Sequence, residues 1–164
     1  LEIVPWKHRK NNHRKHREGI VMIKEKLTGQ FTTRLQKVEL NEVPSESGKP
    51  LPGAQLNYSD QISWDVLPQK LRVKLTRTIK FEPETLFSIV VSYYVDHELS
   101  EENALSNISP ENLRGEICKD LPYYLCEQQG ALSRISLIIA NLTASFGGMP
   151  IVLPPALPGA EDLH

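Results

Sequence analysis

The chain has 164 residues, of which 40% are hydrophobic and 24% charged, a composition typical of one globular domain. A chain of this length buries roughly two-thirds of its unfolded surface, enough for a core without outside support. The formal net charge is −1. The longest apolar run, at residues 135–142, is far shorter than the ~20 residues of a membrane-spanning helix, which excludes such a span.

The two cysteines, Cys118 and Cys126, have neither the spacing of a disulfide framework nor that of a zinc site. Free thiols are typical of a reducing compartment. The basic residues near the N-terminus are not followed by the apolar stretch of a secretory signal. We therefore expect a cytoplasmic protein that has no cofactor, no metal and no membrane insertion.

The segment Lys7–Arg17 carries six cations and three histidines but no acidic residue. Without these six cations, 13 cations face 20 acids, so the rest of the chain carries about −7. The segment can be read as a nucleic-acid-binding arm, as a metal-binding histidine tract or as a disordered tail. Among these readings, we expect no nucleic-acid partner.

A further interpretation is that this N-terminal segment is not translated. The first methionine is Met22, and Arg17-Glu18-Gly19 can be encoded by purine-rich codons that resemble a bacterial ribosome-binding site. We accordingly expect a basic tail over 1–21 that is untranslated or disordered, a single domain over 22–158 and a flexible end over 159–164.

Four segments have the alternation of polar and apolar residues that is typical of β-strands. They are Phe31–Val43, Gln55–Val66, Lys70–Phe81 and Phe87–Val95, and the first two are separated by a loop over Pro44–Gly53. The last three follow one another through short connections, which predicts antiparallel neighbours. One face of this sheet is apolar and needs a cover.

Two of the predicted strands are irregular. In the first, Phe31 and Leu35 lie in one phase but Val38 and Leu40 in the other, which predicts a bulge or burial of both faces in turn. In the second, Asp60 alone interrupts the apolar side.

The remainder of the chain predicts helices. Ser109 is placed as an N-cap before Pro110, and an apolar stripe repeats every fourth residue from Leu113 to Leu125. Pro122 lies inside this stripe and predicts a kink or break near Asp120. The order of elements predicts an α+β fold, with a four-stranded antiparallel sheet followed by two helices packed on one face.

The last third, 131–158, contains the densest apolar sequence. Its first half predicts a buried helix, which Gly147 and Gly148 terminate. Ile151–Leu153 is framed by prolines and predicts a short extended segment. This much apolar surface needs a partner, either the rest of the domain or another chain, and we expect a homo-oligomer.

Asp96-His97-Glu98 raises an enzymatic alternative, because acid–base chemistry needs titratable groups that converge in a pocket. No nucleophile motif, phosphate loop or metal-ligand spacing accompanies them. We interpret these three residues as a solvated strand end and expect no enzyme. The neighbouring tyrosines at 93, 94, 123 and 124 are more typical of a core or an interface.

The order of elements and the closing motif resemble the SecB export-chaperone family, especially its divergent Gram-positive branch. The resemblance is carried by Ile135–Ile139, Leu142-Thr143 and above all Phe146-Gly147-Gly148-Met149-Pro150-Ile151-Val152-Leu153-Pro154-Pro155. It implies a homotetramer, built as a dimer of dimers, that holds unfolded proteins for export without ATP. The chain departs from the proteobacterial members of this family in two places. It has the basic start, and it lacks their acidic C-terminal tail apart from Glu161 and Asp162.

We expect client peptides to bind an apolar surface formed by Trp64, Tyr58, Phe146, Met149, Ile151 and Leu153. The resemblance also implies that an acidic pair on the sheet docks the SecA-type translocase motor. Glu42 matches one of these acids by position, whereas Val38 occupies the place of the other. Two alternatives stay open: a chaperone that serves a toxin–antitoxin pair, and a SecB-fold assembly protein that is not a chaperone.

Overall fold

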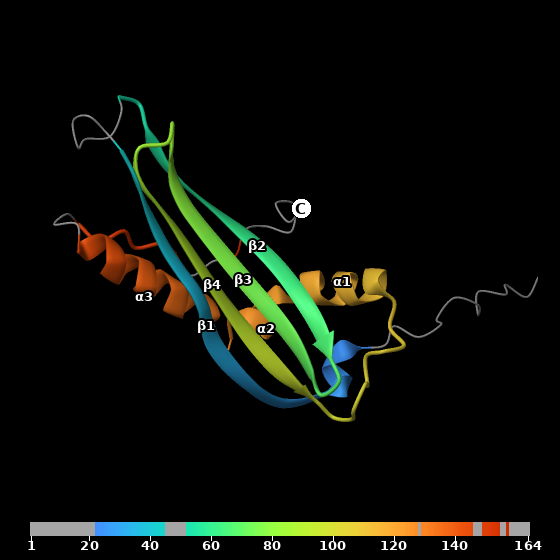
Figure 1. Ribbon diagram of the computed structural model, residues 1–164. Helices are drawn as coiled ribbons and strands as arrows, with labels where there is room; N and C mark the ends of the chain where they lie inside the picture. Colours follow the sequence, from blue (N-terminus) through green and yellow to red (C-terminus); the bar gives the residue numbers. More distant parts are fainter. Residues whose placement is uncertain (1–21, 45–51, 128, 146–148, 155–156, 158–164) are drawn as a thin grey trace, which may run out of the picture.

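The computed structural model describes residues 22–44, 52–127, 129–145, 149–154 and 157 (Figure 1). Its elements, in chain order, are the short 3-10 helix η1 (Ile23–Lys26), the strands β1 (Leu27–Val43), β2 (Gln55–Leu67), β3 (Lys70–Glu82) and β4 (Leu86–Leu99), and the helices α1 (Pro110–Lys119), α2 (Leu121–Leu125) and α3 (Ala131–Ala144).

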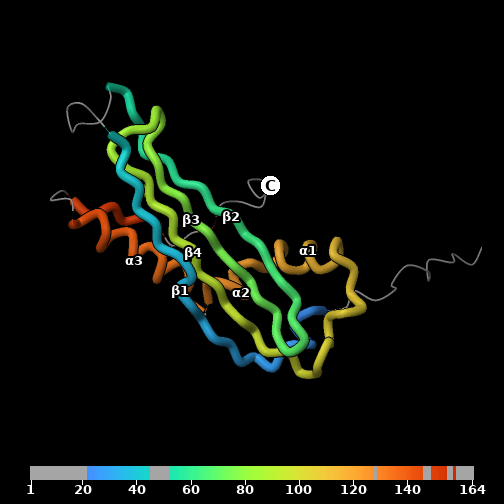
Figure 2. The backbone as a smooth tube through the Cα atoms, in the orientation of Figure 1, coloured from blue at the N-terminus to red at the C-terminus, as the bar shows by residue number. Residues whose placement is uncertain are grey.

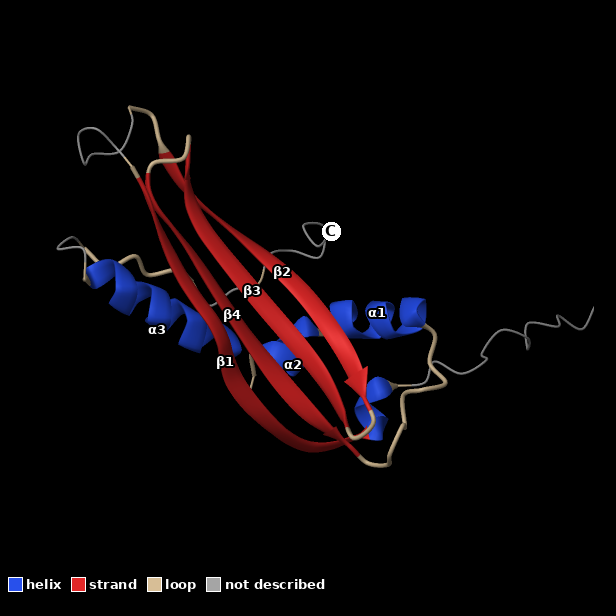
Figure 3. Cartoon of the chain, in the orientation of Figure 1, coloured by secondary structure: helices blue, strands red, loops and turns tan. Residues whose placement is uncertain are grey.

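The four strands form one antiparallel sheet in the order β1-β4-β3-β2, so β1 and β2 are the edges. The three helices follow the sheet in the chain and lie on one side of it (Figures 1 and 3). Helix α3 packs against β4, and α2 contacts both β3 and β4. The predicted α+β fold is confirmed.

Strand β3 defines the two sides of the sheet. Leu71, Val73, Leu75, Arg77 and Ile79 point to the side of the helices and are fully buried. The intervening Lys70, Arg72, Lys74, Thr76, Thr78 and Lys80 point to the other side and are partly exposed. We call these sides the covered face and the open face. The core lies between the covered face and the helices.

The bulge predicted in the first strand is confirmed. The register between β1 and β4 shifts between Leu35 and Lys37, because two residues of β1 oppose one of β4. Leu35 then pairs with Tyr93 and Val38 with Val91, so both point to the covered face although they differ in sequence phase. The bulge thus restores the alternation.

Two strand boundaries differ from the prediction. Strand β1 begins at Leu27, four residues before Phe31, and β4 continues to Leu99 rather than ending near Val95. Asp96 and His97 therefore lie within β4, an inner strand of the sheet, and both are almost completely buried. The prediction of a solvated strand end was wrong for these two residues.

The residues that were predicted to begin and break the helices do so in the structure. The side chain of Ser109 accepts a hydrogen bond from the N–H of Asn112 and caps α1. The apolar stripe is divided at Asp120, one residue before α2, because Pro122 cannot continue the hydrogen-bond ladder of α1. Helix α3 ends at Ala144, before the two glycines, which lie outside the described residues.

After α3 the chain turns back across the covered side of the sheet (Figures 2 and 3). Residues Met149–Pro154 contain no helix or strand. We call this segment the strap. The N–H of Ile151 donates to Oγ1 of Thr143 at 2.8 Å, which ties the strap to the last turn of α3.

Candidate functional site

Strand β2 carries an apolar row that the helices cover incompletely. Tyr58, Ile62, Trp64 and Val66 alternate along the covered face of this edge strand. Ile62 and Trp64 pack against the core, whereas Tyr58 is 44% exposed and Val66 is also exposed. We call these four residues the β2 strip. In the described part of the molecule, β2 has a neighbouring strand on one side only. Its outer edge can therefore form backbone hydrogen bonds with another extended chain.

The strap adds further exposed apolar side chains. Ile151 and Leu153 turn inward and pack on the core, whereas Val152 between them is 73% exposed. Met149 is 91% exposed. The alternation is that of an extended segment with one anchored side and one free side. Of the predicted binding residues, Phe146 lies outside the described part of the chain.

A buried ion pair joins the β2 strip to the strap. Arg77 donates from Nε and Nη2 to the two carboxylate oxygens of Asp60, at 2.7 and 2.6 Å. The guanidinium also lies 5.0 Å from the ring centre of Tyr58, and Nη1 donates to the carbonyl oxygen of Pro154 at 3.5 Å. Tyr58 and the end of the strap therefore flank the same guanidinium, which brings part of the predicted binding surface together.

Sequence reasoning missed Arg77. It interrupts the apolar alternation of β3 just as Asp60 interrupts that of β2, and the two positions are direct partners in the register. An acid and a base that each replace an apolar residue, at facing positions of two predicted neighbouring strands, could have indicated this ion pair from the sequence.

A second exposed apolar row lies on the other edge of the sheet. Leu35, Val38 and Leu40 of β1 are exposed on the covered face. Leu137 of α3 is 62% exposed, and Arg134 of the same helix reaches over to the hydroxyl of Tyr93. Helix α3 packs on β4, the neighbour of β1 in the sheet. We group the exposed apolar residues of these two elements, Leu35, Val38, Leu40 and Leu137, under the name β1–α3 strip.

Glu42 lies near the end of β1, opposite Phe87, and is exposed. Its place in the register puts it on the same side of the sheet as Val38 and Leu40. Within the described residues no ion pair involves Glu42. Its proposed role in docking a motor remains a prediction.

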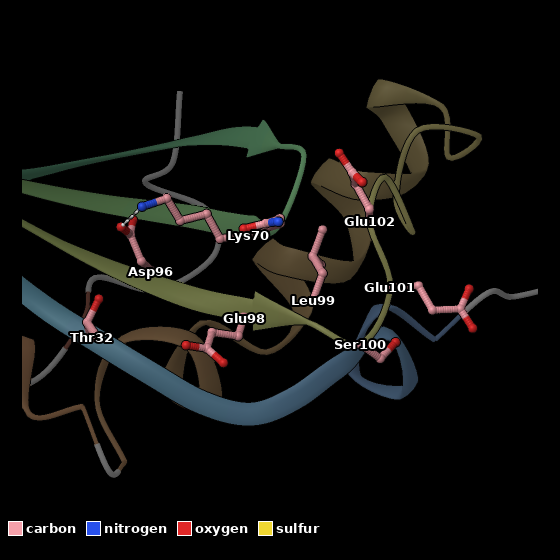
Figure 4. Close-up of a pocket in the computed structure, with 9 residues that line it drawn as sticks. Thr32, Lys70, Asp96, Glu98, Leu99, Ser100, Glu101 and Glu102 are labelled. Carbon is pink, nitrogen blue, oxygen red and sulfur yellow. Dashed lines mark hydrogen bonds and ion pairs between the residues drawn. The ribbon is translucent and has the colours of Figure 1, made fainter.

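The Asp96-His97-Glu98 triplet does not converge. Asp96 lies on the open face, where Lys70 and Arg72 donate to its carboxylate, and Glu98 lines the same cavity of about 590 Å³ at the end of the sheet (Figure 4). His97 points to the covered face, where its Nε2 lies 2.9 Å from the carbonyl oxygen of Tyr124. The imidazole and the two carboxylates lie on opposite faces of the sheet, so they do not converge on one site.

The electrostatics of these buried groups also favour structural roles. Burial lowers the pKa of His97, despite its hydrogen bond to the Tyr124 carbonyl. Burial alone would raise the pKa of Asp96, but hydrogen bonds from Arg72 and Lys70 outweigh it and hold this pKa below its ordinary value. Burial raises the pKa of the Cys126 thiol to about 11, so the reactive thiolate is not formed at neutral pH.

The described residues contain no cluster of three or more His, Cys, Asp or Glu side chains placed to hold a metal ion. No helix in the described part of the chain is long and apolar enough to cross a membrane.

Comparisons with known proteins find similarity in structure alone. No protein-family model and no curated protein sequence matches the chain. The fold is similar to that of the SecB-like chaperone Rv1957 of Mycobacterium tuberculosis, solved in complex with a ChAD peptide from the Rv1956 HigA1 antitoxin. That comparison has a TM-score of 0.58 and 11% identity, and it covers 82% of this chain and 90% of the other.

A protein of unknown function from Streptococcus agalactiae matches with a TM-score of 0.30 and 10% identity, over 76% of this chain and 97% of that one. The four antiparallel strands, the helices that follow them and the match to Rv1957 show that this chain has a SecB-like fold.

Proposed function

We propose that the protein is an ATP-independent chaperone that holds unfolded or extended polypeptide segments on the β2 strip and the strap. The observation that carries this proposal is the exposure of Tyr58, Val66, Met149 and Val152 on a SecB-like fold. Exposed aromatic and aliphatic side chains on a free edge strand suit a chain that brings its own apolar side chains and unpaired backbone.

The strap suits clients of varied sequence. Met149 provides a flexible, polarizable side chain of the kind that adapts to different partners. Pro150 and Pro154 have no N–H, so the strap cannot extend into a long sheet edge that promotes aggregation. These features favour binding through apolar contact and short backbone pairing, with weak sequence preference.

The energy of such binding is compatible with reversible holding. Burying ~400 Å² of apolar client surface contributes on the order of 10 kcal/mol before costs, at ~25 cal/mol/Å². Ordering the client and restricting its motion offset much of this gain. Affinity should therefore increase with the length of the unfolded segment.

Two kinds of client are candidates. Preproteins destined for export, delivered to a SecA-type motor, are implied by the resemblance to export chaperones. An antitoxin is favoured by a specific observation, because the similar Rv1957 structure holds an antitoxin peptide. Co-purification of native complexes, followed by mass spectrometry of the bound chains, separates these two candidates.

The test of holding itself is an aggregation assay. A chemically denatured model protein is diluted into buffer with and without the chaperone, and light scattering is followed. We expect suppression at near-equimolar protein, and we expect suppression to persist when salt is raised severalfold, because apolar contacts are barely screened. Unchanged aggregation, or holding that salt abolishes, contradicts the proposal and favours a non-chaperone assembly protein.

A further inference from the structure

The pair of Asp60 and Arg77 is unusual because both side chains have 0% exposure on a face that buries mainly apolar side chains. Removing two charges from water is expensive, and a well-packed apolar pair in their place is often as stable or more stable. A buried ion pair is therefore weak evidence for a role in stability. What the pair supplies is a guanidinium held in one orientation, since both oxygens of Asp60 accept from it.

The oriented guanidinium also contacts the carbonyl oxygen of Pro154. Arginine has only donors, and a proline-framed segment offers more acceptors than donors, because Pro150 and Pro154 have no N–H. A buried cation in the sheet is thus chemically matched to the strap backbone. At the other end of the strap, the N–H of Ile151 donates to Thr143.

These two anchors, with the inward side chains of Ile151 and Leu153 between them, determine which way the strap faces. They leave Val152 outward, and Tyr58 lies beside the guanidinium. If the carbonyl of Pro154 were released, the outward face of the strap would lose its fixed position relative to the β2 strip.

We infer that Arg77, oriented by Asp60, is a positioning residue that anchors the strap through the carbonyl of Pro154. It keeps the outward face of the strap aligned with the β2 strip for an extended polypeptide client. This inference rests on the proposed holding function for its effect on clients. Its effect on the strap is independent of that function.

The test replaces both charges, because a single replacement leaves an uncompensated buried charge. In the double variant Asp60→Leu/Arg77→Met, amide hydrogen exchange over Met149–Pro154 is measured on the full chain. We expect exchange about tenfold faster, the size typical of losing one hydrogen bond to a charged group. The dissociation constant for a labelled, reduced and carboxymethylated α-lactalbumin should rise about fivefold, as expected when a binding surface loses its preorganisation.

The matched control is Asp96→Leu/Arg72→Met, which removes a similar two-point Arg–Asp pair from the open face of the same sheet. We expect it to change neither strap exchange nor client binding. Unchanged strap exchange in Asp60→Leu/Arg77→Met overturns the role of Arg77, as does an equal rise in the control.

A second variant covers the case in which the double variant does not fold. Arg77→Lys keeps the charge beside Asp60, but an ammonium lacks the rigid fork that reaches both Asp60 and Pro154. Faster strap exchange in this variant supports the inference, and native exchange contradicts it. If the wild-type chain binds no client at all, the proposed function fails, while strap exchange still decides the role of Arg77.

Discussion

At the scale of single residues, His97 is a buried imidazole whose protonation differs between the folded and the unfolded chain. It lies among the rings of Phe31, Tyr123 and Tyr124, and its neighbour Asp96 points to the opposite face. Burial lowers its pKa, so the folded protein favours the neutral imidazole. The unfolded chain then binds more protons than the folded chain at mildly acidic pH. The contribution of the neutral imidazole to the free energy of unfolding is fully present above about pH 6.5, the ordinary pKa of histidine. It is lost as the pH falls through the lower pKa that His97 has in the folded protein.

We therefore predict that the free energy of unfolding, from urea titration, decreases between about pH 7.5 and about pH 5.5. His97 is the one histidine between residues 22 and 158, so His97→Gln should remove most of this decrease. The carboxylate of Asp96 does not interfere, because its lowered pKa moves its own contribution to still lower pH. An equal decrease in the variant and the wild type would show that other groups cause it.

Trp64 combines packing with partial exposure, since it contacts the core from the edge strand. Loss of a large aromatic side chain costs stability wherever it packs, by roughly 3 kcal/mol or more when the residue is fully buried. We predict that Trp64→Ala weakens client holding more than it lowers the melting temperature. Losses in proportion to each other would indicate a core residue alone.

At the scale of elements, helix α1 depends on its first turn. The Ser109 hydroxyl satisfies the N–H of Asn112, which has no partner within the helix. Ser109→Ala should lower the free energy of unfolding by about 1 kcal/mol. Chemical denaturation measures this, with Ser63→Ala on the exposed side of β2 as the control. A loss no larger than that of the control would mean that the cap contributes little.

The sequence predicts elements best where the signal is local. Pro122 breaks a helix by its own covalent structure, and Ser109 caps one through a neighbour three residues away. The buried Asp96 and Arg77 were not predicted, because their partners lie on other strands and the hydrophobic pattern treats charged residues as solvated. The exposed sides of the strap and of the β2 strip depend on how helices cover the sheet, which alternation alone does not determine.

At the scale of the whole molecule, the β1–α3 strip bears on assembly. Its four aliphatic side chains are all exposed, and exposed aliphatic side chains that gather on a surface favour contact with another chain. We predict a homo-oligomer, with a tetramer expected from the resemblance and a dimer next. Static light scattering should give a multiple of the 18.6 kDa chain mass at micromolar concentration.

The β1–α3 strip also predicts which change disrupts the assembly. Leu137→Glu should shift the scattering mass toward the monomer, because a charge at a desolvated contact is costly. Thr78→Glu on the open face is the control and should leave the mass unchanged. A monomeric wild-type protein would contradict the expectation of an oligomer.

The central proposal, that the covered side of β2 holds unfolded chains, is tested most directly by a matched pair of tyrosines. Tyr58 lies in the β2 strip, whereas Tyr94 lies on the open face beneath the guanidinium of Arg72. The measurement is the dissociation constant for a labelled unfolded protein, by fluorescence anisotropy. We predict that Tyr58→Ala weakens binding about tenfold, equivalent to about 1.4 kcal/mol of lost apolar contact, and that Tyr94→Ala leaves it within about twofold. Equal effects of the two variants, or a larger effect of Tyr94→Ala, would contradict the proposal.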